Sequence, residues 1–185
     1  MTRSKEFTDA ARAVFVFDAV AQEFKKLSVE LRLGLAKEIQ LPLFLQVLSK
    51  DEEPRVRCAV ATNIYSATEI LEVLSKDEDN DVRAAVAQNT NTTPEILKAL
   101  CKDQYSMVRF YIALNAKSDS GILKSLSKDK DNMVRRAVAM NLKTDLEVLN
   151  AMLRDKDGFV RHIAITRISE DQFQRLADLM PPRLS

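Results

Sequence analysis

The sequence predicts an all-α fold in which paired short helices stack as a solenoid with a repeat of 26 residues. The pair Val-Arg recurs with this unvarying step at Val56-Arg57, Val82-Arg83, Val108-Arg109, Val134-Arg135 and Val160-Arg161. An aspartate keeps the same step from Asp51 to Asp155, and an asparagine keeps it from Asn63 to Asn141. A fixed period of this size is typical of stacked-repeat proteins, in which each unit packs on its neighbours.

Composition favours one elongated helical domain over residues 1–185. Apolar residues make up 46% of the chain, and the presence of only 3 Gly and 5 Pro argues against a turn-rich β fold or a disordered chain. Repeats fill nearly all of the length, so no separate catalytic module is expected. Arg12 and Asp18 interrupt the first apolar run, which is too short for a secretory signal, and no stretch approaches a membrane span.

The N-terminal part predicts a cap followed by an irregular repeat. Residues 1–28 are expected to contain a cap helix over 6–27, whose apolar side chains are Phe7, Val14, Phe15, Phe17, Val20 and Phe24. Residues 29–50 resemble a degenerate first repeat that is about one residue short, with Leu31-Arg32 through Ile39 as its first helix and Phe44, Leu45 and Leu48 in its second. A terminal unit needs such a cap because only one side of it has a neighbour.

Regular repeats are expected over residues 51–168, and each repeat is expected to contain two helices. In the unit from Asp77 to Lys102, Val82, Ala85, Val86 and Asn89 lie at the i, i+3, i+4 and i+7 spacing of one helix face. We call this first helix the A helix; it is expected to begin after Asp79 and to end near the recurring asparagine.

The second helix of each repeat, the B helix, is expected to begin with a capping box. Thr92 to Glu95 has the required hydroxyl and acid, and the same pattern recurs at 66–69, at 144–147 and, shifted by one residue, at Ser169 to Gln172. Ile96, Leu97 and Leu100 then form its apolar face. Helices of roughly ten and eight residues are too short to be stable alone, so stacking must supply the stability.

A closing helix and tail are expected over residues 169–185. Phe173, Leu176 and Ala177 form its apolar face, and Pro181-Pro182 ends it.

The segment Asp79–Asn89, DNDVRAAVAQN, followed by TTPEIL at 92–97, resembles the repeat of the variant leucine-rich repeat family over about residues 45–168. This resemblance implies a right-handed superhelix of paired short helices. The repeat here is slightly longer than in that family, which brings the B helix closer to HEAT-like repeats. The family's N-terminal iron–sulfur cluster is not carried over, because Cys58 and Cys101 do not lie in an N-terminal cysteine cluster. The resemblance implies no common activity and no cofactor.

The repeated polar residues have two interpretations. Arg57, Arg83, Arg109, Arg135 and Arg161 form a column that suits a regular polyanion such as a phosphate backbone. The favoured interpretation is structural: an aspartate precedes each arginine by six residues, so the pair bridges its own A helix or ties it to the neighbouring unit. The asparagine column likewise either faces a ligand or, as favoured, closes the backbone groups at a helix end.

Catalysis and metal binding have little support in the sequence. His162 is the only histidine, and no serine or cysteine has a recognisable catalytic partner. A HEAT-like DNA glycosylase is the specific enzyme alternative, but the chain has no Trp to stack on an exposed base. The two cysteines form no metal or redox spacing, and we expect a cytoplasmic, non-enzymatic protein.

One face of the A helices changes character along the chain. In early repeats it carries Arg55, Cys58, Thr62, Asp81, Ala84 and Gln88, and in later repeats it carries Met107, Phe110, Leu114, Met133, Arg136, Met140, Phe159, His162 and Thr166. Methionines adapt to varied contacts, and exposed apolar surface marks interaction sites. We hypothesise that Met107, Phe110, Leu114, Met133, Arg136, Met140 and Phe159 dock a partner protein or a second copy of the chain. The alternative is that this face is packed between repeats.

Charge is unevenly distributed, which predicts a second possible partner. Residues 41–100 hold 6 Lys or Arg against 10 Asp or Glu, whereas residues 101–170 hold 13 against 9. The sequence therefore predicts a protein-binding scaffold, with nucleic-acid binding through the basic half as the alternative. The residues expected to contact nucleic acid are Lys102, Lys117, Lys124, Lys128, Lys130, Arg135, Arg136 and Lys143.

Overall fold

The computed structural model describes residues 16–179, and the side chains of residues 16–172. Over this range the chain folds into helices joined by short loops, without a strand. It divides into two compact units, Met1–Thr92 and Thr93–Ser185. In both, consecutive A helices pack side by side. The predicted all-α solenoid architecture is confirmed.

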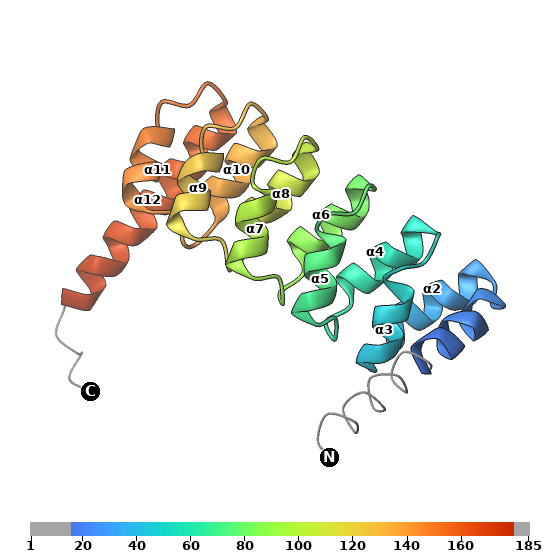
Figure 1. Ribbon diagram of the computed structural model, residues 1–185. Helices are drawn as coiled ribbons and strands as arrows, with labels where there is room; N and C mark the ends of the chain where they lie inside the picture. The colour runs from blue at the N-terminus through green and yellow to red at the C-terminus, as the bar shows by residue number, and fades with distance from the viewer. Residues whose placement is uncertain (1–15, 180–185) are drawn as a thin grey trace, which may run out of the picture. The chain divides into compact units, whose positions relative to one another are not determined.

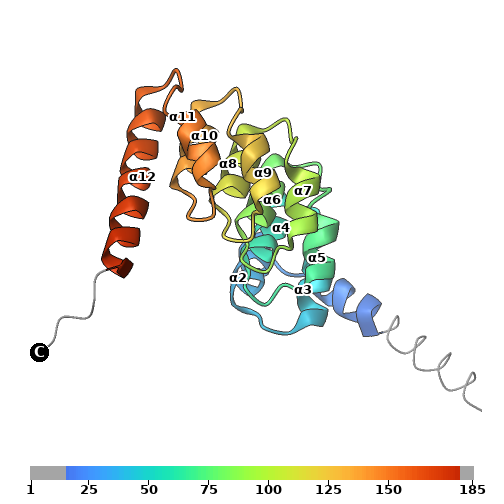
Figure 2. The same cartoon turned by 90° about the vertical axis from the view of Figure 1, so that its left-hand side faces the viewer.

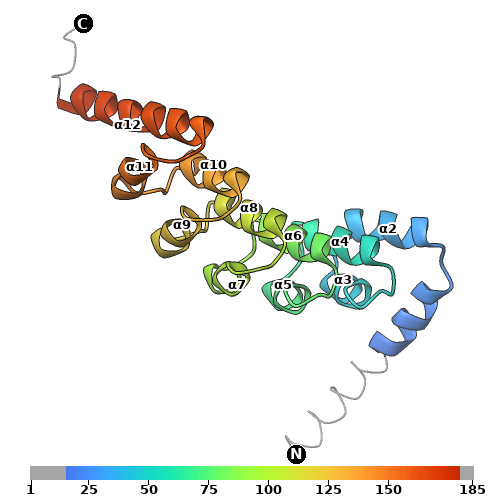
Figure 3. The ribbon, with the colours of Figure 1, turned by 90° about the horizontal axis from the view of Figure 1, so that it is seen from above.

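The first unit begins with a helical segment over residues 16–25. Its A helices form one layer (Figure 1) and comprise α2 (Val29–Glu38), α4 (Pro54–Thr62) and α6 (Asn80–Gln88). Its B helices form the second layer, which Figure 3 shows edge-on, and comprise α3 (Pro42–Leu48) and α5 (Thr68–Leu74).

The second unit has the same two layers. Its A helices are α8 (Ser106–Leu114), α10 (Asn132–Met140) and the first part of α12 (Gly158–Leu179). Its B helices are α7 (Pro94–Leu100), α9 (Ser120–Leu126) and α11 (Leu146–Met152). The core lies between the layers, where the valines and alanines of the A helices meet the isoleucines and leucines of the B helices.

The predicted periodicity of the helices is confirmed. Val82 and Val86 on α6 are completely buried, as is Leu97 on α7. The regular A helices have nine residues and the B helices seven, so neither kind is stable alone. Burial of each large aliphatic side chain contributes about 1.5–3 kcal/mol, and packing between repeats therefore stabilises the helices.

The recurring asparagine is the C-cap of each regular A helix, and Asn63, Asn89 and Asn141 also tie their helices to the preceding repeat. Asn141, the C-cap of α10, donates through Nδ2 to the carbonyl oxygens of Ala113 (2.7 Å) and Asn115 (3.2 Å) on the preceding repeat. Its Oδ1 accepts the backbone N–H of Lys143 at 2.9 Å. Asn141 is buried, so its amide closes backbone groups and does not face a ligand. Asn89 makes the equivalent bonds to Ala61 and Asn63.

The predicted capping boxes at 66–69, 92–95 and 144–147 are wrong. The Ser66 hydroxyl donates to the carbonyl oxygen of Val60 (2.6 Å), and Thr92 does the same to Val86. These hydroxyls are buried against the last turn of an A helix, where a free carbonyl needs a donor. The N-cap of the B helix is the following residue: Thr93, for example, accepts the N–H of Ile96.

The predicted helix break at 168–169 is also wrong, because α12 runs without interruption from Gly158 to Leu179 (Figure 2). The repeat places Arg167 in the asparagine column and Glu170 in the hydroxyl column. Since the two side chains that end the other A helices are missing, the helix continues through this region. The side chains of Phe173, Leu176 and Ala177, and the residues Pro181 and Pro182, lie outside the described part.

The N-terminal segment packs on the first repeat as a cap. The ring of Phe24 lies 5.5 Å from that of Phe44, and Lys50 Nζ lies 4.9 Å from the centre of the Phe17 ring. Arg32 takes the position that Arg57 holds in the next repeat, although it precedes its aspartate by 19 residues and not 20. The predicted one-residue shortening of this repeat is thus confirmed. The expectations for Phe7, Val14 and Phe15 concern residues outside the described range.

Candidate interaction surface

Four arginines of the ladder positions form buried ion pairs: Arg32, Arg57, Arg109 and Arg135. Arg57 donates from Nε and Nη2 to the carboxylate of Asp77, at 2.7 and 2.8 Å, and from Nη1 to the carbonyl oxygen of Asp51 at 2.8 Å. Arg32, Arg109 and Arg135 make the same bidentate contact with Asp51, Asp129 and Asp155. Each rung therefore joins an A helix to the loop of the next repeat.

Both partners of a rung are held in the charged form. Hydrogen bonding to Asp129 raises the pKa of Arg109 above its usual value, although burial works in the opposite direction. Burial also opposes ionisation of Asp129, but hydrogen bonds from Arg109 and from the backbone N–H of Asp131 outweigh it, so the pKa of Asp129 is lowered. In each rung the two charges therefore neutralise each other through their own hydrogen bonds.

These contacts favour the structural interpretation of the ladder over the phosphate-binding one. Arg57, Arg109 and Arg135 are buried, and a carboxylate already occupies the donors that a phosphate would need. Arg135 is 4% exposed and must be removed from the residues expected to contact nucleic acid. The sequence placed Arg135 both in the periodic column, for which a structural role was favoured, and in the basic stretch with Arg136; its ion pair with Asp155 decides for the structural role.

The apolar residues predicted on the second half of the chain line the outer face of the second unit. Five of them are exposed, on three consecutive A helices: Met107 (40%), Leu114 (40%), Met133 (48%), Met140 (56%) and Phe159 (65%). Phe110 is half-buried and makes an edge-on contact with the ring of Tyr111 at 5.4 Å. We call Met107, Phe110, Leu114, Met133, Met140 and Phe159 the apolar stripe. The alternative that this face is packed between repeats does not hold for the five exposed residues within the second unit.

Arg136 is part of this surface but does not act as a free cation. Its guanidinium carbon lies 4.4 Å from the centre of the Phe159 ring, and its Nη2 donates to Asp157 at 2.7 Å. Hydrogen bonds from Arg136 and then from Asn132 lower the pKa of Asp157 strongly. Lys117 and Lys143, in the loops that follow α8 and α10, are exposed.

A shallow depression adjoins Phe159 at the end of the stripe. It is lined by Arg136, Lys156, Asp157, Gly158, Phe159 and His162. His162, the only histidine of the chain, is exposed.

The lysines expected to contact nucleic acid lie in three places. Lys102, Lys128 and Lys130 belong to loops that lead from a B helix into an A helix, whereas Lys117 and Lys143 belong to loops at the opposite ends of the A helices. Lys124 lies on α9 and pairs with Glu147 at 2.9 Å. The structure does not bring these lysines together into one patch.

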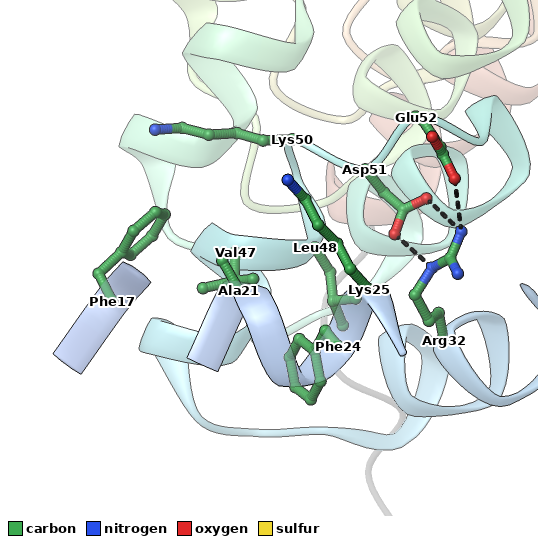
Figure 4. A pocket seen from close by; sticks show the side chains of 10 residues that line it. All are labelled: Phe17, Ala21, Phe24, Lys25, Arg32, Val47, Leu48, Lys50, Asp51 and Glu52. Atoms are coloured by element: carbon green, nitrogen blue, oxygen red, sulfur yellow. Dashed lines mark hydrogen bonds and ion pairs between the residues drawn. The ribbon is translucent and has the colours of Figure 1, made fainter. Parts of the chain in front are cut away.

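A groove in the first unit was not anticipated from the sequence. It has a volume of about 350 Å³ and lies where the segment 16–25 meets α3, with Lys25 and Lys50 beside an apolar floor and the Arg32–Asp51 pair nearby (Figure 4). The apolar lining residues are Phe17, Ala21, Phe24, Val47 and Leu48. The sequence has no signal for it, because the groove depends on how the cap helix crosses α3.

Other kinds of site have little support in the part of the chain that the structure describes. There, no group of three or more His, Cys, Asp or Glu side chains is arranged to hold a metal ion. Cys58 and Cys101 are free thiols, and burial is the main cause that raises the pKa of each. Within residues 16–179, no helix combines the length and the apolar character needed to span a membrane.

Comparison with known proteins agrees with this architecture. The family model of the HEAT repeat matches residues 41–71, which include α3, α4 and the start of α5. The chain is built from HEAT-like helical repeats. A comparison with curated proteins gives no match. The match lies in the first unit, so the apolar stripe of the second unit is outside the matched residues.

Proposed function

We propose that this chain is a non-enzymatic scaffold that binds another protein through the apolar stripe of the second unit. The observation that carries the proposal is the exposure of Met107, Leu114, Met133, Met140 and Phe159 on consecutive A helices. Contiguous apolar side chains left in water mark an interaction surface.

The position of the stripe in the repeat supports this proposal. In the first unit the residues equivalent to Met133 and Met140 are Asp81 and Gln88, which are also exposed. A purely structural requirement would apply to both units, because their A helices have the same length and the same buried face. The change from polar to apolar residues is therefore best explained by a partner specific to the second unit.

The chemistry of the stripe indicates a protein partner. Thioether side chains are flexible and fit irregular apolar surfaces, and helical repeats present extended surfaces that are used in binding. Lys117 and Lys143 are exposed in the loops that follow α8 and α10 and add positive charge near the ends of these two helices. We propose further that the protein works in the cytoplasm without a cofactor. The resemblance to variant leucine-rich repeats adds no activity to this proposal.

The proposal is tested with matched substitutions in the two units. Met140→Asp places a charge in the stripe, and Gln88→Asp places the same charge at the equivalent position of the first unit. Both sites are exposed, so both variants should keep the thermal unfolding temperature of the parent. Proteins captured by the parent chain are purified, and their affinity for each variant is measured by calorimetry.

We expect Met140→Asp to weaken binding by at least about tenfold, because a buried unpaired charge costs more than 1.4 kcal/mol, and Gln88→Asp to leave it unchanged. Phe159→Asp should repeat the loss. Equal affinity of the folded Met140→Asp variant for every purified partner would remove the stripe as the binding surface. Phe110 is not used, since its half-buried ring makes a folding defect hard to separate from lost binding.

Nucleic-acid binding is the alternative, and the exposure of Lys102, Lys117, Lys128, Lys130 and Lys143 is the observation in its favour. These lysines lie at opposite ends of the A helices, which does not suit a single phosphate backbone. Titration with a labelled DNA duplex over a salt series decides the matter. Binding that falls steeply as salt rises supports phosphate contacts, and its absence at low salt excludes them.

A further inference from the structure

The four buried arginines of the ladder all bind the same kind of group. In each, the guanidinium takes an aspartate from the loop before the next A helix, at distances of 2.6 to 3.1 Å. The same aspartate accepts the backbone N–H two residues further on, as Asp129 does from Asp131 and Asp155 from Asp157. The ligand of the ladder is therefore a carboxylate held in the turn that precedes a helix.

Arg161 holds the ladder position on α12, but the next aspartate is missing. Its Nη1 donates to the carbonyl oxygen of Asp155 at 2.7 Å, as in the other repeats. The step of 26 residues places the next ladder position at residue 181, which is proline. Among the side chains of residues 16–172, no carboxylate forms an ion pair with Arg161, which is exposed.

The residues next to Arg161 on α12 are exposed, whereas the equivalent residues of the preceding A helix are covered by the next repeat. Ile165 is 54% exposed, whereas Ala139, its equivalent on α10, is completely buried. His162 is exposed, whereas its equivalent Arg136 contacts Asp157 of the next repeat. The edge of α12 formed by Arg161, His162 and Ile165 thus corresponds to the face that the next A helix covers in the repeats before it.

We propose that this edge of α12 binds a helix of another protein that has an aspartate in the turn before its first residue. The partner's carboxylate would accept the Nε and Nη2 protons of Arg161, as Asp155 accepts those of Arg135. An apolar side chain of the same helix would cover Ile165. The edge adjoins the apolar stripe, because His162 and Phe159 line the same depression. Arg161 and Ile165 are not part of the stripe, and the inference does not depend on the function proposed above.

A second copy of the chain, joined head to tail, does not supply this carboxylate. Leu27 occupies the ladder position of the first repeat, where the second repeat has Asp51. The carbonyl oxygen of Leu27 accepts a hydrogen bond from Arg32 Nη1 at 2.8 Å. The first repeat therefore offers no aspartate to Arg161 at the ladder position.

The partner helix also differs from a further repeat of this chain. In the regular repeats an asparagine of the next repeat donates to carbonyl groups at the end of the A helix, as Asn141 does to Ala113 and Asn115. In α12 the helix continues through the equivalent residues 165 and 167, so its own backbone uses those carbonyl groups. Recognition therefore depends on the carboxylate and on apolar contact, not on an asparagine.

The test uses a peptide that copies an internal rung. A stapled, fluorescein-labelled peptide with the sequence of residues 129–141 contains Asp129 before the helix corresponding to α10. Its binding to the full chain is followed by fluorescence polarisation. We expect saturable binding that Arg161→Gln weakens by at least about tenfold, since a bidentate charge-assisted contact is lost.

Controls separate the contact from general charge attraction. Arg154→Gln removes an exposed arginine of the preceding loop and should change the affinity by less than about twofold. A second peptide carries asparagine in place of Asp129. Its affinity for the parent chain should be as low as the affinity of the original peptide for the Arg161→Gln variant. Met140→Asp, in the apolar stripe, should leave peptide binding intact.

Absence of saturable binding, or binding insensitive to Arg161→Gln, would overturn the proposal. Sedimentation of the chain alone tests whether a second copy binds this edge. Self-association of the parent chain that Arg161→Gln abolishes would assign the edge to a second copy and would contradict the proposal. Monomeric parent and variant chains, with peptide binding dependent on Arg161, are the expected results.

Discussion

Substitution of Asp129 by alanine should destabilise the second unit more than any surface substitution. The change removes the carboxylate that binds Arg109 at 2.6 and 2.9 Å, and it leaves the guanidinium buried with 7% of its side chain exposed. Removing one partner of a buried ion pair costs about 3–5 kcal/mol, because the remaining charge is desolvated without compensation. This is a large part of the roughly 5–15 kcal/mol by which a domain is stable.

The measurement is urea unfolding followed by the helical circular dichroism signal, with a matched control. Glu147→Ala breaks the exposed pair with Lys124, in which 58% and 79% of the two side chains are accessible, and should not change the unfolding curve measurably. Arg109→Met combined with Asp129→Ala should recover part of the loss, because the buried charge is gone. A loss below about 1 kcal/mol for Asp129→Ala, or a double variant less stable than the single one, would refute the reasoning.

Three further outcomes are expected. Asn141→Ala loses two hydrogen bonds to the preceding repeat and should cost about 1–3 kcal/mol in the same urea assay; an unchanged midpoint would show that the amide is dispensable. The lowered pKa values of Asp129 and Asp155 contribute stability above about pH 4 that is lost as pH falls through the folded-state values, so the free energy of unfolding should decrease on acidification. This slope should be smaller in Asp155→Asn. Arg167→Asn with Glu170→Ser restores the two residues that end other A helices and should interrupt α12, which ¹³Cα chemical shifts of residues 168–171 would reveal by losing their helical values, because these residues are equivalent to the loop 142–145.

Most of the repeat architecture could be predicted because it is encoded locally and recurs. The spacing of Val82, Ala85 and Val86 specifies one helical face, and its repetition every 26 residues implies that the faces stack. The continuity of α12 could also have been predicted from the sequence. Arg167 and Glu170 stand at the positions where the earlier repeats have the asparagine and the hydroxyl residue that end the A helix. The pattern Ser169 to Gln172 concealed this, because a capping box can be recognised by residue type without its hydrogen bonds.

The sequence by itself determined the helices, their order, the rows of equivalent residues and the change of one face from polar to apolar. Only the tertiary structure decided which aspartate pairs with each arginine, where the hydroxyls of Ser66 and Thr92 point, and that the apolar stripe is exposed. The physical reason is the repeat itself. Each ladder arginine has one aspartate six residues before it and an equivalent one twenty residues after it, as Arg57 has Asp51 and Asp77. Periodicity cannot choose between identical residue types, but packing does: the guanidinium takes the carbonyl oxygen of Asp51 and the carboxylate of Asp77.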